Sequence, residues 1–174
     1  MKAINLFILI CFLGFQTISA QEINVKSSKV TFDLTNMKVN TVSGSFMNMS
    51  GNVKFDVNDL ENSSFDVCID ASTVNTGNKK RDNHLKNEDF FEVEKYPEIC
   101  FKSEAITKYQ GNFVTKGKLS MHGVTKEILI PFTFDGKTFK GAFKINRLDF
   151  KVGESTSEFS VSNEISIAVS CELQ

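Results

Sequence analysis

The fold is decided by the last long alternating stretch of the sequence, residues 159–173 (FSVSNEISIAVSCEL). Its apolar side chains share one phase of a two-residue repeat: Phe159, Val161, Ile165, Ile167, Val169, Cys171 and Leu173. Most positions between them carry Ser or Glu. Because successive side chains of a β-strand point to opposite faces, this stretch predicts a strand with one face in a core and the other in water.

The same two-residue repeat runs through most of the chain. It recurs in residues 30–34, 42–46, 49–55, 65–69, 99–101, 113–119, 128–134 and 139–145. Turn signals such as Gln110-Gly111-Asn112 and Asp135-Gly136 separate several of these runs and suit hairpins between sequence neighbours. We therefore expect an all-β fold, an eight-stranded antiparallel up-and-down barrel, because closing the sheet removes its exposed edges.

Four glycines and one proline interrupt these runs. Gly44, Gly51, Gly117 and Gly141 fall on the inward phase, where they permit sharp bends or leave room in the interior. Pro131 falls on the outward phase of its run and lacks a backbone N–H. It predicts a bulge or a locally unpaired strand edge.

Residues 77–96 (GNKKRDNHLKNEDFFEVEKY) break the pattern. The stretch is highly charged, has no two-residue repeat, and holds the one short helix that we expect, at residues 78–87, with a second turn at residues 89–92. Phe90 and Phe91 are candidates to plug one end of the barrel. Long connections with structure of their own are disproportionately functional, so we expect this insertion at the site.

The first 20 residues are typical of an export signal. Lys2 precedes the apolar run 6–15, and the small Ala20 closes the segment. The run is shorter than the ~20 residues of a membrane-spanning helix, and the bulky residue before Cys11 disfavours lipidation there. We expect cleavage near Ala20, which leaves one domain, residues 21–174, in the periplasm or secreted.

Cys68, Cys100 and Cys171 remain after this cleavage, and an odd number cannot form a closed disulfide set. Cys68 and Cys100 lie out of phase with the apolar residues of their runs, so they face outward on neighbouring strands and could pair; the alternative is three unpaired thiols. Cys171 shares the inward phase, so we expect it to be buried and unpaired. The chain has no CxxC pair and only two His, so we expect no metal site.

The sequence contains no recognisable catalytic constellation. It lacks a GxSxG elbow, an HExxH pair and a phosphate-binding glycine loop. His84 could serve as a general base, but anchoring a loop is the simpler role, and His122 suits a tight turn. Arg147 and Asp149 suit a surface ion pair. A formal net charge of −1 is also far from the dense positive charge that nucleic-acid binding requires.

The apolar face is the main feature that remains, with 17 Phe and no Trp in the chain. An eight-stranded barrel is either filled by its own side chains or holds one small ligand, and periodicity does not separate these cases. The residues alone leave open a packed domain with a surface function, a carrier of hydrophobic ligands, and an enzyme. The lining we expect for a tunnel is Phe46, Phe55, Phe90, Phe91, Ile99, Phe101, Phe113, Leu119, Ile130, Phe132, Phe143, Phe159 and Ile167.

Several blocks of sequence carry a more specific pattern. They are residues 76–85 (TGNKKRDNHL) with 89–97 (DFFEVEKYP), residues 117–126 (GKLSMHGVTK), residues 145–150 (INRLDF) and the early segment 42–46 (VSGSF). Together they resemble the YceI-like family of periplasmic polyisoprenoid-binding proteins, and the resemblance covers essentially all of residues 22–173.

This resemblance implies a lipocalin-like barrel around a long apolar tunnel, with a helix in the insertion near one end. It also implies an exported protein, often a homodimer, that binds an isoprenoid, quinone or fatty-acyl chain without enzymatic activity. The bound lipid is then the only cofactor, and nucleic acid is not a partner. The alternative function is a periplasmic or surface interaction or stress-related module with a packed core, and an isoprenoid-processing enzyme comes third because Asp-rich metal motifs are absent.

Two basic residues of the insertion are candidates for the head-group site. Arg81 and His84 stand three residues apart on the expected helix, share a face, and could together receive a polar or anionic head. The alternative is a capping salt bridge between Arg81 and a nearby acid.

Overall fold

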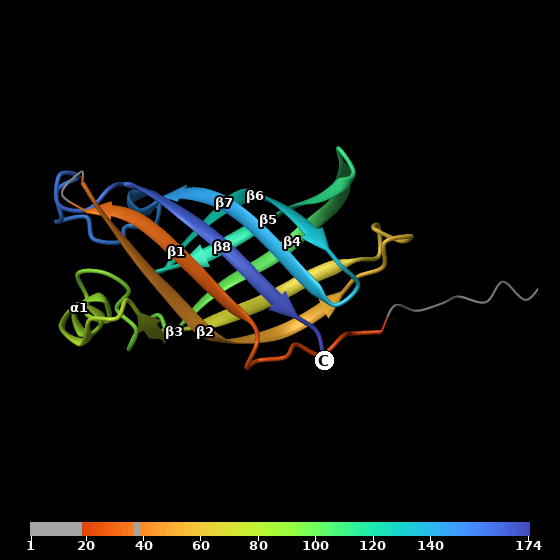
Figure 1. Ribbon diagram of the computed structural model, residues 1–174, viewed down its shortest axis with the longest axis horizontal. Helices are drawn as coiled ribbons and strands as arrows, with labels where there is room; N and C mark the ends of the chain where they lie inside the picture. The colour runs from red at the N-terminus through yellow and green to blue at the C-terminus, as the bar shows by residue number, and fades with distance from the viewer. Residues whose placement is uncertain (1–18, 37–38) are drawn as a thin grey trace, which may run out of the picture.

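The chain forms a closed eight-stranded antiparallel barrel in the computed structural model (Figure 1). The structure describes residues 19–36 and 39–174, so the expected export signal lies almost wholly outside the described residues. The elements are β1 (Lys29–Asn36), β2 (Asn40–Lys54), β3 (Ser64–Asn75), α1 (Lys79–Leu85), β4 (Glu98–Tyr109), β5 (Asn112–Met121), β6 (Val124–Phe134), β7 (Thr138–Asn146), the 3-10 helix η1 (Arg147–Phe150) and β8 (Glu164–Glu172).

Each strand pairs with its neighbour in the sequence, and β8 returns to pair with β1. Phe32 of β1 illustrates the closure, because it stands opposite Gly44 of β2 on one side and Ile167 of β8 on the other. The alternation of buried and exposed residues along the strands gives the barrel an apolar interior and a polar outer face. The predicted all-β up-and-down barrel with one short helix in its long insertion is confirmed.

The barrel is irregular where the sequence places Pro131. The β5–β6 register continues through the pair Val114 and Pro131 without a shift, so the expected bulge is absent. The β6–β7 ladder is short, however, and includes only Phe132 to Phe134 of β6. The nitrogen of Pro131 has no hydrogen to donate to a β-ladder. The edge of β6 that faces β7 is unpaired from Pro131 back toward the start of the strand, which is the second of the two outcomes that the sequence predicted.

Two glycines on the predicted inward phase have different roles. Gly44 makes room for an aromatic ring, because a Cβ there would lie 2.2 Å from Cζ of Phe32. Gly51 allows β2 to bend: its φ is +122°, and register shifts between β2 and β3 precede it.

Six phenylalanines fill one end of the barrel. The ring of Phe55 lies within 6.0 Å, centroid to centroid, of each of the other five, mostly in edge-to-face contact. The cluster consists of Phe55, Phe65, Phe113, Phe132, Phe134 and Phe139. These residues stand where β2 leads to β3, β4 to β5 and β6 to β7, and we call them the aromatic plug.

The opposite end carries the connections with structure of their own. The insertion with α1 and the loop that follows η1 both lie at the end of the barrel away from the β2–β3 and β6–β7 connections (Figure 1). We call this end the mouth. No helix within the described residues has the length and apolar character needed to cross a membrane.

Candidate functional site

The barrel encloses a cavity of about 420 Å³, lined by side chains from all eight strands, from α1 and from the residues after it. Most of the lining side chains are apolar. The volume falls within the range of roughly 300–1,000 Å³ that is usual for small-molecule sites. A packed domain would have its interior filled by its own side chains. This barrel instead leaves an internal space.

Ten of the thirteen expected lining residues border this cavity. They are Phe46, Phe90, Phe91, Ile99, Phe101, Leu119, Ile130, Phe132, Phe143 and Ile167. Phe32 and Phe139 border it as well, although we did not include them in the expected set. Both stand on the inward phase of their runs, so the alternation already contained the signal for them.

Three expected lining residues do not reach the cavity. Phe55 and Phe113 face inward as predicted, but they lie at the closed end and pack into the aromatic plug. Phe159 is 58% exposed and lies in a turn before β8, which begins only at Glu164. Residues 159–163 thus alternate in sequence but lie in the loop before β8, where alternation does not indicate a face of the sheet.

The insertion forms a shorter helix than its sequence predicted. Asn78 caps α1 by accepting a hydrogen bond from the backbone N–H of Arg81 (3.1 Å), and the helix ends at Leu85 instead of residue 87. The expected second helical turn at residues 89–92 is irregular turn structure. Backbone hydrogen bonds from Phe91 to Leu85 and from Val93 to Lys86 fold this segment back against the end of α1.

Arg81 borders the cavity from α1 and is held by a threonine, not by an acid. Its Nε donates to Oγ1 of Thr76 (2.8 Å), and its Nη2 donates to the carbonyl oxygen of Thr76 (3.0 Å). Asp82 accepts from the backbone N–H (2.8 Å) and the hydroxyl (2.5 Å) of the same threonine. The expected capping salt bridge of Arg81 is absent from the described residues, and Thr76 replaces its acid partner.

His84 borders the mouth of the cavity one turn after Arg81. Its Nε2 lies 3.5 Å from a carboxylate oxygen of Asp89, and both side chains are 57% exposed. The ring of Phe90 packs edge-on to the imidazole with 5.1 Å between centroids. The structure therefore places both Arg81 and His84 at the border of the cavity.

Arg147 is a charged residue of the cavity lining that the sequence did not predict. It does not pair with Asp149 on the surface, because its side chain turns inward and the residue is only 4% exposed. Its guanidinium donates to five backbone carbonyl oxygens, those of Val152, Gly153, Thr156, Val161 and Ser162. Desolvation lowers the pKa of Arg147 from its ordinary value, an effect that the charge of Glu158 opposes. The side chain organises the loop between η1 and β8.

His122 joins three connections at the mouth, in the structural role that the sequence suggested. It has a φ of +50° and stands with Gly123 (φ +75°) at the turn between β5 and β6. Its Nδ1 is 3.3 Å from the carbonyl oxygen of Phe150, and its Nε2 is 3.7 Å from a carboxylate oxygen of Glu92. The ring of Tyr96 packs edge-on against it at 5.1 Å.

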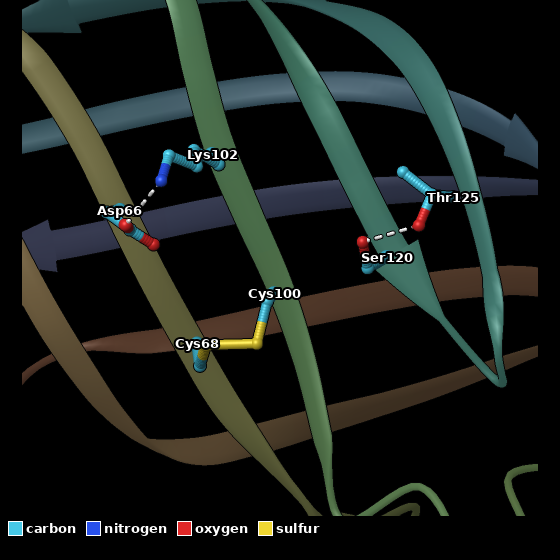
Figure 2. The surroundings of a disulfide bond; sticks show 6 residues. All are labelled: Asp66, Cys68, Cys100, Lys102, Ser120 and Thr125. Carbon is cyan, nitrogen blue, oxygen red and sulfur yellow. Dashed lines mark hydrogen bonds and ion pairs between the residues drawn. A yellow bond between two sulfur atoms is a disulfide. The ribbon is translucent and has the colours of Figure 1, made fainter.

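The cysteines occupy the positions that the repeat predicted. Cys68 of β3 and Cys100 of β4 are directly paired in the register and form a disulfide on the outer face, with 4.0 Å between their Cα atoms (Figure 2). Glu98 lies near both sulfurs, but the disulfide leaves no thiolate for a metal. Cys171 is buried and unpaired, borders the cavity, and has its pKa raised by burial to about 11.

A family model supplies the assignment that the fold suggests. The description of that model is "YceI-like domain", and it matches residues 21–173. The chain belongs to the YceI-like family. Among its curated relatives is a UPF0312 protein of Vibrio parahaemolyticus, which is 28% identical over 151 residues and is matched over 80% of each chain.

Solved structures of other proteins share the barrel. BcnA of Burkholderia cenocepacia is 27% identical, with a TM-score of 0.80 over 86% of this chain and 98% of that chain. A polyisoprenoid-binding domain from Saccharophagus degradans, described as implicated in plant cell wall breakdown, is 15% identical with a TM-score of 0.69 over 89% of this chain and 98% of that chain. At this identity the second likeness concerns the fold alone.

Proposed function

We propose that this YceI-like protein is an exported, non-enzymatic binding protein that holds the chain of an isoprenoid or another long-chain lipid inside its barrel. The observation that carries the proposal is the cavity of about 420 Å³, whose wall consists mainly of aliphatic and aromatic side chains. Water in such a space would find few polar partners, whereas a hydrocarbon chain would lose its own contact with water.

The size of the cavity sets the scale of the ligand. At about 30 Å³ per heavy atom, the volume that one water occupies in the liquid, 420 Å³ accommodates roughly 14 such atoms. Burial contributes ~0.8 kcal/mol for each methylene-sized group, or about 11 kcal/mol in total. This exceeds the cost of association, ~4–15 kcal/mol, over much of that range, so one medium-length chain is a ligand of a size that the barrel can retain.

Other observations support the remaining parts of the proposal. Export rests on the pattern of residues 1–20. A role without catalysis is consistent with a cavity whose polar lining residues have structural partners, as Arg81 has in Thr76 and Arg147 has in the backbone. The polyisoprenoid binding named for the Saccharophagus degradans domain is consistent with a lipid ligand.

Two adjacent residues of β6 provide the test. Ile130 is 9% exposed and borders the cavity, whereas its neighbour Leu129 is 62% exposed on the outer face. We expect Ile130→Glu to abolish binding of farnesol in a titration, because a buried unpaired carboxylate admits water to the apolar interior. The matched control Leu129→Glu should bind farnesol like the unmodified protein, and circular dichroism should report the same strand content in all three.

Undiminished binding by a folded Ile130→Glu variant would place the ligand outside the barrel and overturn the proposal. If the unmodified protein bound neither isoprenoid nor fatty-acyl chains, an interaction module without lipid cargo would be the better explanation.

A further inference from the structure

Two rows of outward side chains flank the disulfide on β3 and β4, and their charges differ. In the first row, Asp66 stands opposite Lys102 in the register, and Nζ of Lys102 lies 3.4 Å from a carboxylate oxygen of Asp66 (Figure 2). In the second row, on the other side of the disulfide, Asp70 stands opposite Glu98. Like charges directly opposite each other destabilise a pair of strands. The second row therefore works against the strand pairing that the first row supports.

No basic side chain forms an ion pair with this acidic row within the described residues. The ion pairs found there include neither Asp70 nor Glu98. Lys86 attracts Asp70 through its charge, from beyond ion-pair distance. Asp70 accepts hydrogen bonds from the backbone N–H (2.8 Å) and the hydroxyl (2.6 Å) of Ser72, which stabilise its carboxylate. Negative charge without a contacting counter-ion therefore lies beside the disulfide.

Glu98 and the two cysteines form a set of three close ligand atoms. The sulfur atoms of Cys68 and Cys100 and a carboxylate oxygen of Glu98 all lie within 4.8 Å of one another. Proteins bind Zn²⁺ through thiolates at about 2.3 Å and carboxylate oxygens at about 2.0–2.2 Å, so tetrahedral ligands of one ion stand about 4 Å apart. Small rotations of these three side chains are enough to reach one cation. Asp70 lies outside the set and adds only charge.

The register of the strands, and not their spacing in the sequence, brings these ligands together. Cys68 and Cys100 are separated by 32 residues but stand directly opposite each other. Glu98 precedes Cys100 by two residues, so its side chain shares the outer face of β4. The lack of a CxxC pair, from which the sequence predicted no metal site, therefore does not apply to ligands on neighbouring strands.

We propose that Cys68, Cys100 and Glu98 form a redox-controlled site for Zn²⁺, or a divalent cation of similar ligand preference, on the outer face of the barrel. The oxidised chain holds the disulfide and does not bind the ion. An external dithiol breaks the S–S bond: the two cysteines take up two electrons and two protons, and the dithiol becomes a disulfide. The cation then displaces both thiol protons to solvent and forms two metal–sulfur bonds. Glu98 is the third ligand, and water takes the fourth position.

Titration with Co²⁺ tests this inference, because Co²⁺ replaces Zn²⁺ in tetrahedral sites and its absorption reports thiolate ligands. The protein without residues 1–20, which also lacks Cys11, is reduced with a phosphine and freed of it under anaerobic conditions. We expect one Co²⁺ per chain, with sulfur-to-cobalt charge-transfer absorption in the near ultraviolet that Zn²⁺ abolishes by displacement. The oxidised protein should show no such absorption.

Two carboxylates on either side of the disulfide provide matched variants. Glu98→Gln should weaken Co²⁺ binding by about tenfold or more, because even partners beyond the ligands contribute roughly 10–100-fold. Asp66→Asn removes an exposed carboxylate of the first row and should change the dissociation constant by less than about twofold. The double variant Cys68→Ser/Cys100→Ser retains Cys171 and should lose the charge-transfer absorption.

Four results would contradict the proposal. Charge-transfer absorption that persists in Cys68→Ser/Cys100→Ser or in the oxidised protein would place the cobalt elsewhere, and its absence from the reduced protein would exclude the site. Equal affinity in Glu98→Gln, or an equal loss in Asp66→Asn, would overturn the role of Glu98. Circular dichroism accompanies each titration. If reduction unfolds the chain, Zn²⁺ should restore the strand content of the oxidised protein, because metal binding then drives folding, and failure to restore it would also overturn the proposal.

Discussion

The ring of Phe32 on β1 covers Gly44 on β2, so closely that a Cβ on the glycine would lie 2.2 Å from Cζ of the ring. The two residues are paired in the register, and Phe32 is 7% exposed. The ring of Phe32 therefore occupies the space that a side chain at position 44 would fill. This contact helps to hold β1, which closes the barrel.

A methyl group on Gly44 should displace that ring. We expect Gly44→Ala to lower the free energy of unfolding by about 1–3 kcal/mol, the usual cost of overpacking a core. In a Phe32→Leu background the same substitution should cost markedly less, because the smaller side chain leaves room. Urea denaturation of the four proteins in this cycle measures the coupling, and an equal cost in both backgrounds would contradict the contact.

The disulfide between Cys68 and Cys100 should contribute to stability by constraining the unfolded chain. Thiol titration of the denatured, non-reduced protein without residues 1–20 should find one free thiol, that of Cys171, and three would mean that the bridge is absent. For a sequence separation of 32 residues, the double variant Cys68→Ser/Cys100→Ser should lose about 3–4 kcal/mol of unfolding free energy. Both side chains lie on the outer face, so lost packing should add little.

Cys171 should make the protein less stable in alkaline solution. Burial raises the pKa of its thiol from 9.0 to about 11, so the folded state holds the proton more tightly than the unfolded state. Stability is therefore unaffected by this group below pH ~9 and falls as the pH rises toward ~11, by about 2–3 kcal/mol in all. The difference between the unmodified protein and Cys171→Ala across this window isolates the effect, and parallel curves would contradict it.

Arg147 should be essential to the loop before β8. Both Arg147→Gln and Arg147→Lys should lower the free energy of unfolding by roughly 2–4 kcal/mol, because neither side chain can satisfy the carbonyl oxygens that the guanidinium binds. Amide exchange in residues 152–162 should accelerate most. The exposed neighbour Lys151 provides the control, and Lys151→Gln should change neither quantity. Equal protection of the loop in all variants would show that Arg147 does not organise it.

The strands were predictable from the sequence because each has one face in the interior and one in water. That alternation located the wall residue Ile130 and the outward Cys68 and Cys100. It did not separate Phe55 and Phe113 from the cavity wall, because the phase of a residue says which face it occupies and not how far along the barrel it lies. Their place in the aromatic plug depends on contacts between strands distant in the sequence.

The loop between η1 and β8 could not be predicted for a different reason. Its organisation depends on one guanidinium and five backbone carbonyl oxygens, and backbone carbonyls have no signature in the sequence. The charge of Arg147 suggested a position on the surface, but the residue is buried. The apolar side chain of Phe159 suggested a position in the interior, but the residue is exposed. The helix of the insertion was easier to predict, because the capping residue Asn78 stands in the sequence itself.

The central claim is that the barrel holds one lipid chain in its interior, and native mass spectrometry of the protein purified from its own host tests it most directly. The account predicts an adduct of one apolar molecule per protein chain, and organic solvent should release this molecule. The adduct should be absent from Ile130→Glu and present in Leu129→Glu. The account would be contradicted if the protein were detected only at the mass of the unliganded chain, if the solvent extract contained no lipid, and if the protein bound neither farnesol nor tetradecanoate.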